Sequence, residues 1–563
     1  MSSLFKAGIL ALLLEARVAV GAALAAPTVT LDSGTFTGTV GINTQSFLGI
    51  PFAQPPVGDL RFRLPVAIPA YNGTHDATAM GPACPQQAVQ LPILTGLPQE
   101  VVDDVINSIY GTIFTASEDC LTINVIKPAT ATATSKLPVV AWIFGGGFEL
   151  GSPQMYDGTT IVQRSIAMGE PVIYVSMNYR VAAFGFLASK EVRAAGVGNL
   201  GLQDQRQALR WIQKYITAFG GDPTKVTIWG ESAGAISVSL QMLANGGSTE
   251  GLFRAAFMQS GSPIPVGPIE NDYDQIVAQT GCSGASDTLA CLRTVPFANL
   301  KAAQDATPFI FSYQSLILTW LPRADGTFLS DNPQRLVQQG KVANVPFVTG
   351  DCDDEGTLFS LSTLNITTDD QFINYIKTYW VPEGTTAQGN TLNTLYPSDQ
   401  IDGSPFDTGL LNSITPQFKR IAAFQVGFPI LVFVPSHSYL RVTFKGDAVF
   451  QAPRRFFQQT LSGKQNQWAF LSKREKGVPI LGSFHATDIL NIYFDGELTD
   501  YLINFATTLN PNGKTVPNWP AYTTATPNMM TFLDGLFPTT ITQDTYRAAG
   551  MQFLTNLTLE FPV

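Results

Sequence analysis

The sequence predicts an α/β protein, in which buried strands alternate with helices. The β-rich run Val226–Trp229 stops at a glycine-bounded turn, and the apolar segment Ala233–Leu243 that follows it is typical of a buried helix. A second apolar run, Val139–Phe144, is typical of a buried strand and leads directly into three glycines. Hydrophobic residues make up 45% of the chain and charged residues only 13%, which indicates a large core and excludes a disordered chain.

The N-terminal residues are typical of a secretory signal. Lys6 precedes an apolar run, and the small residues that end at Ala25 predict cleavage near that point. We therefore expect residues 1–25 to be a signal peptide and residues 26–563 to be a secreted, extracellular protein. No later apolar stretch reaches the roughly 18 residues that a membrane-spanning helix needs. Sequons that fit a secreted glycoprotein begin at Asn72, Asn365 and Asn556.

The charge and the cysteine content narrow the possible partners. A net charge of −10 argues against nucleic-acid binding, which needs clustered positive charge. With three histidines and no C-x-x-C spacing, we expect no metal site, and we expect no cofactor. If two disulfides form, one of the five cysteines stays free. Cys282 and Cys291 flank a short loop, and Cys84 and Cys120 would bracket a longer one. Cys352 would then be the free cysteine.

The turn Gly230–Gly234 reads G-E-S-A-G and matches the G-x-S-x-G pattern. In this pattern a strand turns sharply into a helix, and small flanking residues avoid a clash where the backbone folds back. The strained turn would lift the hydroxyl of Ser232 away from the sheet, beside the first amides of the helix. The same pattern would also fit a tight turn in which serine is present only because it is small. The motif therefore indicates catalysis only if a base and an acid accompany it.

A serine nucleophile needs a base, and the base needs an orienting acid. In a hydrolase built on this turn the chain order is serine, acid, histidine, which excludes His75. Of the two later histidines, His485 follows the strand-like run Trp468–Ser472, whereas His437 has no comparable setting. The sequence therefore predicts His485 as the base, against the common alternative of a structural histidine.

The acid is expected in a carboxylate cluster that follows the strand-like run Val345–Gly350. The cluster, Asp351–Gly356, reads D-C-D-D-E-G, and the residue pattern does not choose among its members. Its alternatives are a solvated acidic turn and a calcium loop, and the calcium loop lacks the twelve-residue spacing of known sites.

The glycines Gly145–Gly147 after the strand-like run Val139–Phe144 suit an oxyanion hole. Consecutive glycines let backbone N–H groups approach the charge that develops on a carbonyl oxygen. One amide of this loop and the N–H of Ala233 would complete the hole. A plain turn at the strand exit and a phosphate loop are the alternatives, but the phosphate loop lacks its usual lysine and its G-x-G-x-x-G spacing.

Long motifs in the chain span Phe47–Gly58, Glu118–Leu121, Asn199–Arg206, Phe219–Gly234, Ser404–Gly409 and Pro416–Arg420. Through these motifs the chain, from about Pro27 to the C-terminus, resembles the type-B carboxylesterase/lipase family, and most of all its secreted fungal lipases and sterol esterases. The resemblance implies an α/β-hydrolase fold, with a large, mostly parallel central sheet flanked by helices and a disulfide-bracketed lid.

The resemblance also implies the site. It gives the role of acid to Glu355 and the role of base to His485. The oxyanion donors that it implies are the amides of Gly146, Gly147 and Ala233. The disulfides that it implies are Cys84–Cys120 and Cys282–Cys291. The acyl tunnel that it implies is lined by Leu316, Leu318, Trp320, Leu358 and Phe359, which by residue type alone could equally be core.

The chain departs from the family in two places. Animal members often have a histidine before the oxyanion glycines, whereas this chain has Phe144, as its fungal relatives do. Residues 428–445, which include His437, have no counterpart in those relatives. They are interpreted as a surface insertion or as translated intron sequence.

The loop within residues 84–120 favours a lipid substrate. A helical period places Val101, Val105 and Ile109 on one face and acidic residues on the other. An ordinary surface helix would show the same period, but in the lipase relatives this loop is a mobile lid with an apolar inner face. Opening of such a lid would expose an apolar patch to a lipid surface.

Together these features predict a secreted serine ester hydrolase that cleaves long-chain acyl esters, as a lipase or sterol esterase, through an acyl-enzyme on Ser232. The alternatives are a carboxylesterase for short or aromatic esters and a non-catalytic adhesion or binding homologue. We expect an ester substrate at an oil–water interface, a monomer or weak homodimer, and activity that falls below about pH 6 to 7 as the imidazole becomes charged.

Overall fold

The computed structural model describes residues 25–89, 115–264, 266, 271–425 and 448–562. Its centre is an 11-stranded sheet with the order β14-β13-β12-β11-β10-β9-β7-β8-β6-β4-β3. Neighbouring strands from β13 to β8 are parallel, and the antiparallel pairs lie at the two ends of the sheet. The prediction of a large, mostly parallel sheet is confirmed.

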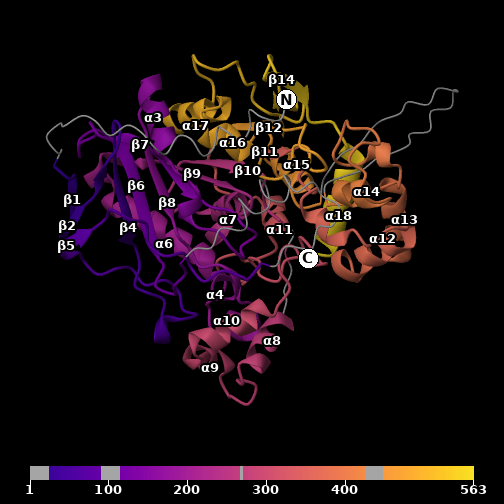
Figure 1. Ribbon diagram of the computed structural model, residues 1–563, viewed down its shortest axis with the longest axis horizontal. Helices are drawn as coiled ribbons and strands as arrows, with labels where there is room; N and C mark the ends of the chain where they lie inside the picture. The colour runs from indigo at the N-terminus through magenta and orange to yellow at the C-terminus, as the bar shows by residue number, and fades with distance from the viewer. Residues whose placement is uncertain (1–24, 90–114, 265, 267–270, 426–447, 563) are drawn as a thin grey trace, which may run out of the picture.

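A smaller three-stranded sheet, β1-β2-β5, lies at one edge of the molecule, in indigo in Figure 1. The strands of the two sheets are β1 (Thr28–Leu31), β2 (Ser33–Thr37), β3 (Thr39–Val40), β4 (Thr44–Pro51), β5 (Asn72–Asp76), β6 (Thr122–Pro128), β7 (Leu137–Ile143), β8 (Ile173–Met177), β9 (Gly221–Glu231), β10 (Ala255–Gln259), β11 (Phe347–Cys352), β12 (Gln467–Lys473), β13 (Asn528–Leu533) and β14 (Thr539–Gln543).

The central strands form because their sequences are apolar on both faces. Strands β8, β10 and β11 are buried along their whole length, as expected for parallel strands covered by helices on both sides. The runs that the sequence predicts as strands fall within β7, β9, β11 and β12, each to within a few residues. The predicted strand is much shorter than β9 itself, because the first residues of β9, Gly221–Lys225, do not form an apolar run.

Helices cover both faces of the large sheet. Helices α3 and α17 contact each other, α6 and α7 contact each other, and both pairs reach β9 or its neighbours. In the view of Figure 1, α3 and α17 lie above the strands and α6 and α7 below them, while α8 to α10 and α12 to α14 form two outlying groups. The helices are α3 (Thr159–Met168), α4 (Ala182–Phe186), α5 (Lys190–Ala194), α6 (Leu200–Tyr215), α7 (Ala233–Gly247), α8 (Asn271–Gln279), α9 (Thr288–Thr294), α10 (Phe297–Asp305), α11 (Pro333–Gln338), α12 (Asp369–Tyr375), α13 (Thr386–Leu395), α14 (Phe418–Phe424), α15 (Gln451–Leu461), α16 (Asp488–Tyr493), α17 (Glu497–Thr508) and α18 (Ala548–Glu560).

The carboxyl ends of four parallel strands converge on one edge of the sheet. Strand β7 ends before the glycine loop, β9 ends before Ser232, β11 ends before Glu355, and β12 ends before the loop that carries His485. In open α/β sheets this edge is where ligands bind. The fold therefore brings to one place residues that lie far apart in the sequence.

The two disulfides that the resemblance implied are present, Cys84–Cys120 and Cys282–Cys291, and Cys352 is a buried free thiol. No helix in the described part of the chain is long and apolar enough to cross a membrane. The expected signal peptide, the apolar helical face at residues 101–109 and the suspected insertion at 428–445 lie outside the described residues. The sequon asparagines Asn72, Asn365 and Asn556 are exposed, as a glycan acceptor must be, and glycosylation stays a prediction.

Candidate active site

Ser232 lies at the sharp turn between β9 and α7. Its φ of 56° falls in the left-handed region, which few serines adopt, and its N–H donates to the carbonyl of Gln259 at 2.8 Å. A Cβ at Gly230 would collide with the backbone of Gly234, and a Cβ at Gly234 would collide with the carbonyl of Ile143. Both glycines are therefore required by the close passage of the chain, as the motif predicted.

His485 bridges Ser232 and Glu355. Its Nε2 lies 2.8 Å from Ser232 Oγ, and its Nδ1 lies 2.5 Å from Glu355 Oε2. The other oxygen of Glu355 accepts the N–H of Cys352 at 2.6 Å, which fixes the carboxylate against the end of β11. All three side chains are buried, and only Ser232 reaches an exposed fraction of 9%. The structure thus brings together the serine, base and acid expected from the sequence.

The glycine loop approaches the serine turn closely. A Cβ at Gly145 would lie 2.7 Å from the carbonyl oxygen of Glu231 and 2.8 Å from Ser232 Cβ, so only glycine fits there. Gly146 and Gly147 have φ values of 107° and 64°, which turn this loop back over the site. Ala233 is the first residue of α7, where an N–H group has no acceptor within the helix. The loop and the helix start together offer backbone donors beside Ser232.

Two carboxylates control the protonation of His485. Burial by itself lowers the pKa of this imidazole, but the negative charges of Glu355 and Glu231 outweigh burial and raise the pKa above its ordinary value of 6.5. Glu231 Oε1 lies 3.3 Å from His485 Nε2. Burial raises the pKa of the Glu231 carboxyl well above its usual range, so Glu231 adds its charge only where it is ionised, and Glu355 makes the larger contribution. The imidazole is therefore a stronger base than a free histidine.

Sequence reasoning did not single out Glu231 or the polar residues behind it. Glu231 occupies a variable position of the motif, so the pattern carries no signal for its role. Gln259 accepts the indole N–H of Trp229 at 2.7 Å and donates to Asp488 Oδ2 at 3.0 Å. These residues come from three separate segments, and only the folded sheet brings them beside the site.

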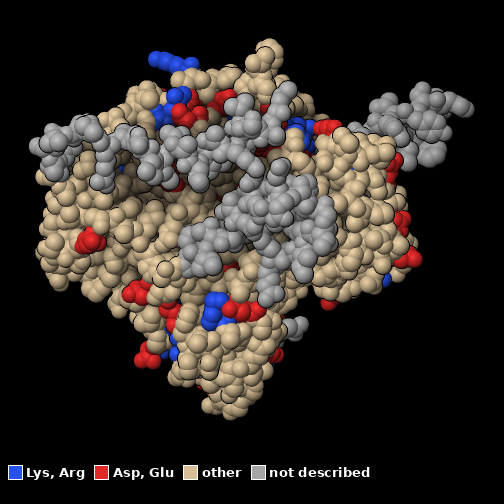
Figure 2. Space-filling model, viewed as in Figure 1, with Lys and Arg blue, Asp and Glu red and all other residues tan. Residues whose placement is uncertain are grey.

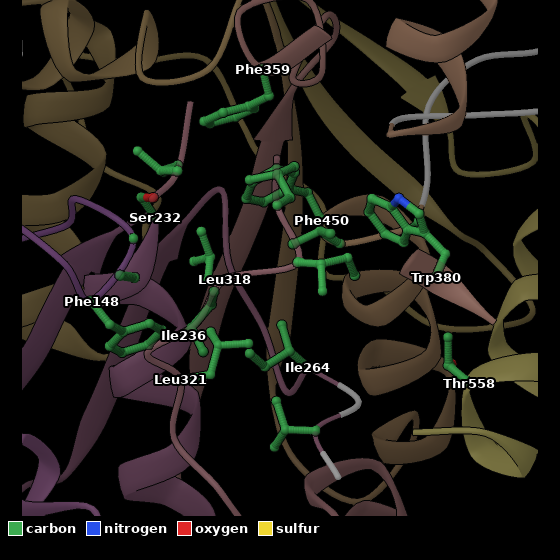
Figure 3. A pocket seen from close by; sticks show the side chains of 18 of the residues that line it. Phe148, Ser232, Ile236, Ile264, Leu318, Leu321, Phe359, Trp380, Phe450 and Thr558 are labelled. Atoms are coloured by element: carbon green, nitrogen blue, oxygen red, sulfur yellow. The ribbon is translucent and has the colours of Figure 1, made fainter. Parts of the chain in front are cut away.

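An apolar cavity opens directly from Ser232. Figure 3 shows Ser232 and Phe148 at one side of this cavity and Trp380 and Thr558 at the other. The only charged residue in its described wall is Arg323. The described residues that line it are Gly147, Phe148, Ser232, Ala233, Ile236, Ile264, Val266, Ile310, Leu316, Ile317, Leu318, Leu321, Arg323, Phe359, Trp380, Val381, Phe424, Ala448, Val449, Phe450, Leu554, Leu557 and Thr558.

Of the five residues expected in an acyl tunnel, Leu316, Leu318 and Phe359 line this cavity. Trp320 and Leu358 are buried but are not part of its wall. Trp320 instead donates its indole N–H to Gln87 at 3.2 Å. The sequence could not separate the two groups, because wall and core positions are equally apolar.

A second cavity meets the first at Ser232 and has a more polar wall. His485 and Glu231 line only this second cavity, together with Gly145, Gly146 and the aromatic Tyr493. Because His485 faces it, this cavity lies on the side to which the imidazole can pass a proton.

The acidic cluster after β11 is not arranged as a metal site. Asp351 pairs with Arg454 at 2.9 Å, and Lys476 lies 2.5 Å from Asp353 and 2.6 Å from Asp354. The described residues contain no group of three or more His, Cys, Asp or Glu side chains that could hold a metal ion. Cations of the protein itself neutralise these carboxylates, which contradicts the calcium-loop alternative.

The order of the large sheet and the serine turn at the end of β9 define an α/β-hydrolase fold. The chain belongs to the carboxylesterase family, whose sequence profile matches residues 25–553, and it is a carboxylic ester hydrolase. It is 43% identical to lipase 4 of Diutina rugosa over 97% of this chain and 98% of that protein. It is 42% identical to a secreted triacylglycerol lipase of Gibberella zeae over 86% of this chain and 82% of that protein. The crystal structure of EstA from Aspergillus niger superimposes with a TM-score of 0.76 and 29% identity, covering 96% of this chain and 99% of EstA.

Proposed function

We propose that the protein is a secreted lipase or sterol esterase, which cleaves long-chain acyl esters through an acyl-enzyme on Ser232. The observation that carries this proposal is the apolar cavity that begins at Ser232 and extends to Trp380 and Thr558 (Figure 3). A long acyl chain is the ligand that such a wall suits, because each buried methylene contributes about 0.8 kcal/mol.

In the proposed reaction His485 Nε2 takes the proton of Ser232 Oγ as the oxygen attacks the ester carbonyl. Glu355 holds the Nδ1–H side of the imidazole and stabilises the imidazolium that forms. The oxyanion accepts hydrogen bonds from the amides of Gly146, Gly147 and Ala233. His485 then gives its proton to the leaving alcohol, and water attacks the acyl-enzyme with the same imidazole as base.

The name of a relative supports a secreted enzyme that acts on lipid. The Gibberella zeae relative is named as a secreted triacylglycerol lipase. On the face shown in Figure 2, the Lys, Arg, Asp and Glu side chains lie in small scattered groups, and no continuous positive area is visible. The lid is proposed to lie within residues 84–120, the ends of which are joined by the Cys84–Cys120 disulfide.

A chain-length series tests the substrate class. We expect kcat/KM for p-nitrophenyl esters to rise from acetate to palmitate, and hydrolysis of emulsified triolein to exceed that of the dissolved monomer. A maximum at acetate, with no effect of an interface, would favour the carboxylesterase alternative. Hydrolysis of cholesteryl oleate beside triolein then separates sterol esters from triacylglycerols. A wild-type protein that no fluorophosphonate labels would favour the non-catalytic homologue.

A further inference from the structure

A single buried carboxylate, that of Asp354, receives four hydrogen-bond donors. Its Oδ1 accepts the hydroxyl of Ser404 at 3.0 Å and the N–H of Phe406 at 2.8 Å. Its Oδ2 accepts the N–H of Ser483 at 2.8 Å and the ammonium of Lys476 at 2.6 Å. The side chain is fully buried, so these four donors offset the cost of removing the carboxylate from water.

Asp354 and one of its four donors, Ser483, lie beside the proposed acid and the proposed base. Asp354 directly precedes Glu355, and Ser483 lies two residues before His485. The backbone strengthens this connection, because the N–H of Asp354 donates to the carbonyl of Ser483 at 2.9 Å and Asp354 forms a parallel β-bridge with Phe484. Glu355 and His485 bond to each other directly, and their neighbours in the chain also bond to each other.

The loop that carries His485 is shaped around this carboxylate. Gly482 has a φ of 62°, and a Cβ there would collide with Asp354 Oδ2. Ser483 is further fixed by its hydroxyl, which donates to the carbonyl of Ser472 at 2.9 Å. A larger residue at 482 would displace either the carboxylate or the loop.

We propose that Asp354 is a positioning residue, which holds the His485 loop at hydrogen-bonding distance from Glu355. This inference rests on the proposed roles of Ser232, His485 and Glu355. A triad loses rate steeply when its groups move by about 1 Å, and the Asp354 side chain joins the segment of Glu355 to the segment of His485. It touches neither the substrate cavity nor Ser232, so it acts through the base and the acid.

The test compares Asp354→Asn with Asp353→Asn. Both changes remove one buried negative charge from the same lysine, Lys476, but Asp353→Asn leaves the four donors of Asp354 in place. We expect Asp354→Asn to lower kcat by about 10- to 100-fold with KM within about twofold, and Asp353→Asn to lower thermal stability without this loss of kcat. Equal effects of the two variants on kcat would overturn the proposal.

The pH profile supplies a second readout. The charged groups that face His485 are Glu355, Glu231 and Asp488, and the bond to Glu355 raises the imidazole pKa. A looser Glu355 bond in Asp354→Asn lowers that pKa, so the acidic limb of kcat/KM moves to lower pH. If the loss of a buried charge alone moved the acidic limb, Asp353→Asn would move it as far as Asp354→Asn does. That result would contradict a positioning role for Asp354.

Gly482→Ala provides the independent variant if Asp354→Asn does not fold. We expect the added methyl to displace the carboxylate and to reproduce the fall in kcat and the shift of the acidic limb. A folded Gly482→Ala protein with wild-type kcat and pH profile contradicts the proposal. The wild-type protein and Ser232→Ala are assayed in parallel, because equal activity in those two would refute the proposed function and not the role of Asp354.

Discussion

Ser232 has a backbone conformation that few serines adopt, and its neighbours explain why it is tolerated. The glycines on either side let the chain pass within contact of itself, and the bond to Gln259 holds the turn open. This geometry requires glycine, which has no side chain, at positions 230 and 234, so it can be predicted directly from the sequence. The protonation of His485 cannot, because it depends on Glu231 at the end of β9 and on Glu355 in the loop after β11.

The pH dependence belongs to this residue scale. His485 must be neutral to accept a proton, and its pKa is raised above 6.5, so the base is lost as pH falls through a value higher than that of a free imidazole. We expect the acidic limb of kcat/KM to have its midpoint above pH 6.5, in the upper part of the range of about 6 to 7 that the sequence predicted or beyond it. Initial rates with a soluble ester across pH 5 to 10 measure it, and a midpoint at or below 6.5 would contradict the described charges.

At the scale of elements, strands were more predictable than the loops that follow them. The apolar runs identify β7, β9, β11 and β12, because a parallel strand buried on both faces has few polar residues. The chain order then excludes His75, and the strand-like run before His485 favours it over His437. The sequence narrowed the choice of the acid only to a cluster, because Asp353, Asp354 and Glu355 are equivalent by residue type. They differ only in the residues that contact them in the folded protein. Family resemblance chose Glu355, and the bonds to His485 and Cys352 agree with that choice.

The apolar cavity is likewise a property of several elements together. Ile264 lies on its wall away from Ser232 (Figure 3). We expect Ile264→Trp to fill this part of the cavity and to lower kcat/KM for palmitate esters by about 10-fold or more, with butyrate esters nearly unchanged. Ile264→Leu, which keeps the volume, is the matched control. Equal losses for both chain lengths would show that the cavity does not hold the acyl chain.

At the scale of the whole molecule, a buried ion cluster joins the end of β11 to the segment after β14. Arg454 bonds to Asp351 at 2.9 Å and to Asp544 at 2.7 Å, and Arg455 bonds to Asp544 at 2.6 Å. These residues are distant in sequence, and no local pattern predicts their pairing. The cluster anchors α15 against the sheet on which the proposed acid is positioned.

This cluster predicts an acid limit to stability. Burial raises the pKa of Asp544, but Arg454 and Arg455 outweigh it and hold that pKa well below its ordinary range. A depressed pKa stabilises the fold above about pH 4, and this contribution is lost as pH falls further. We expect Asp544→Asn to cost about 3–5 kcal/mol at pH 7, because two buried guanidinium groups lose a partner. Denaturant unfolding should show the difference from wild type shrinking below about pH 4, and a constant difference would contradict the linkage.

The most direct test of the account is the reaction of Ser232 itself. A fluorophosphonate should label wild-type protein at one tryptic peptide, the one that contains Ser232, and should abolish ester hydrolysis in proportion to labelling. Ser232→Ala should take no label and should lose kcat by about 10⁵- to 10⁶-fold while unfolding at a temperature close to that of wild type. Labelling at another residue, or near-normal hydrolysis by the folded Ser232→Ala protein, would contradict the proposed mechanism.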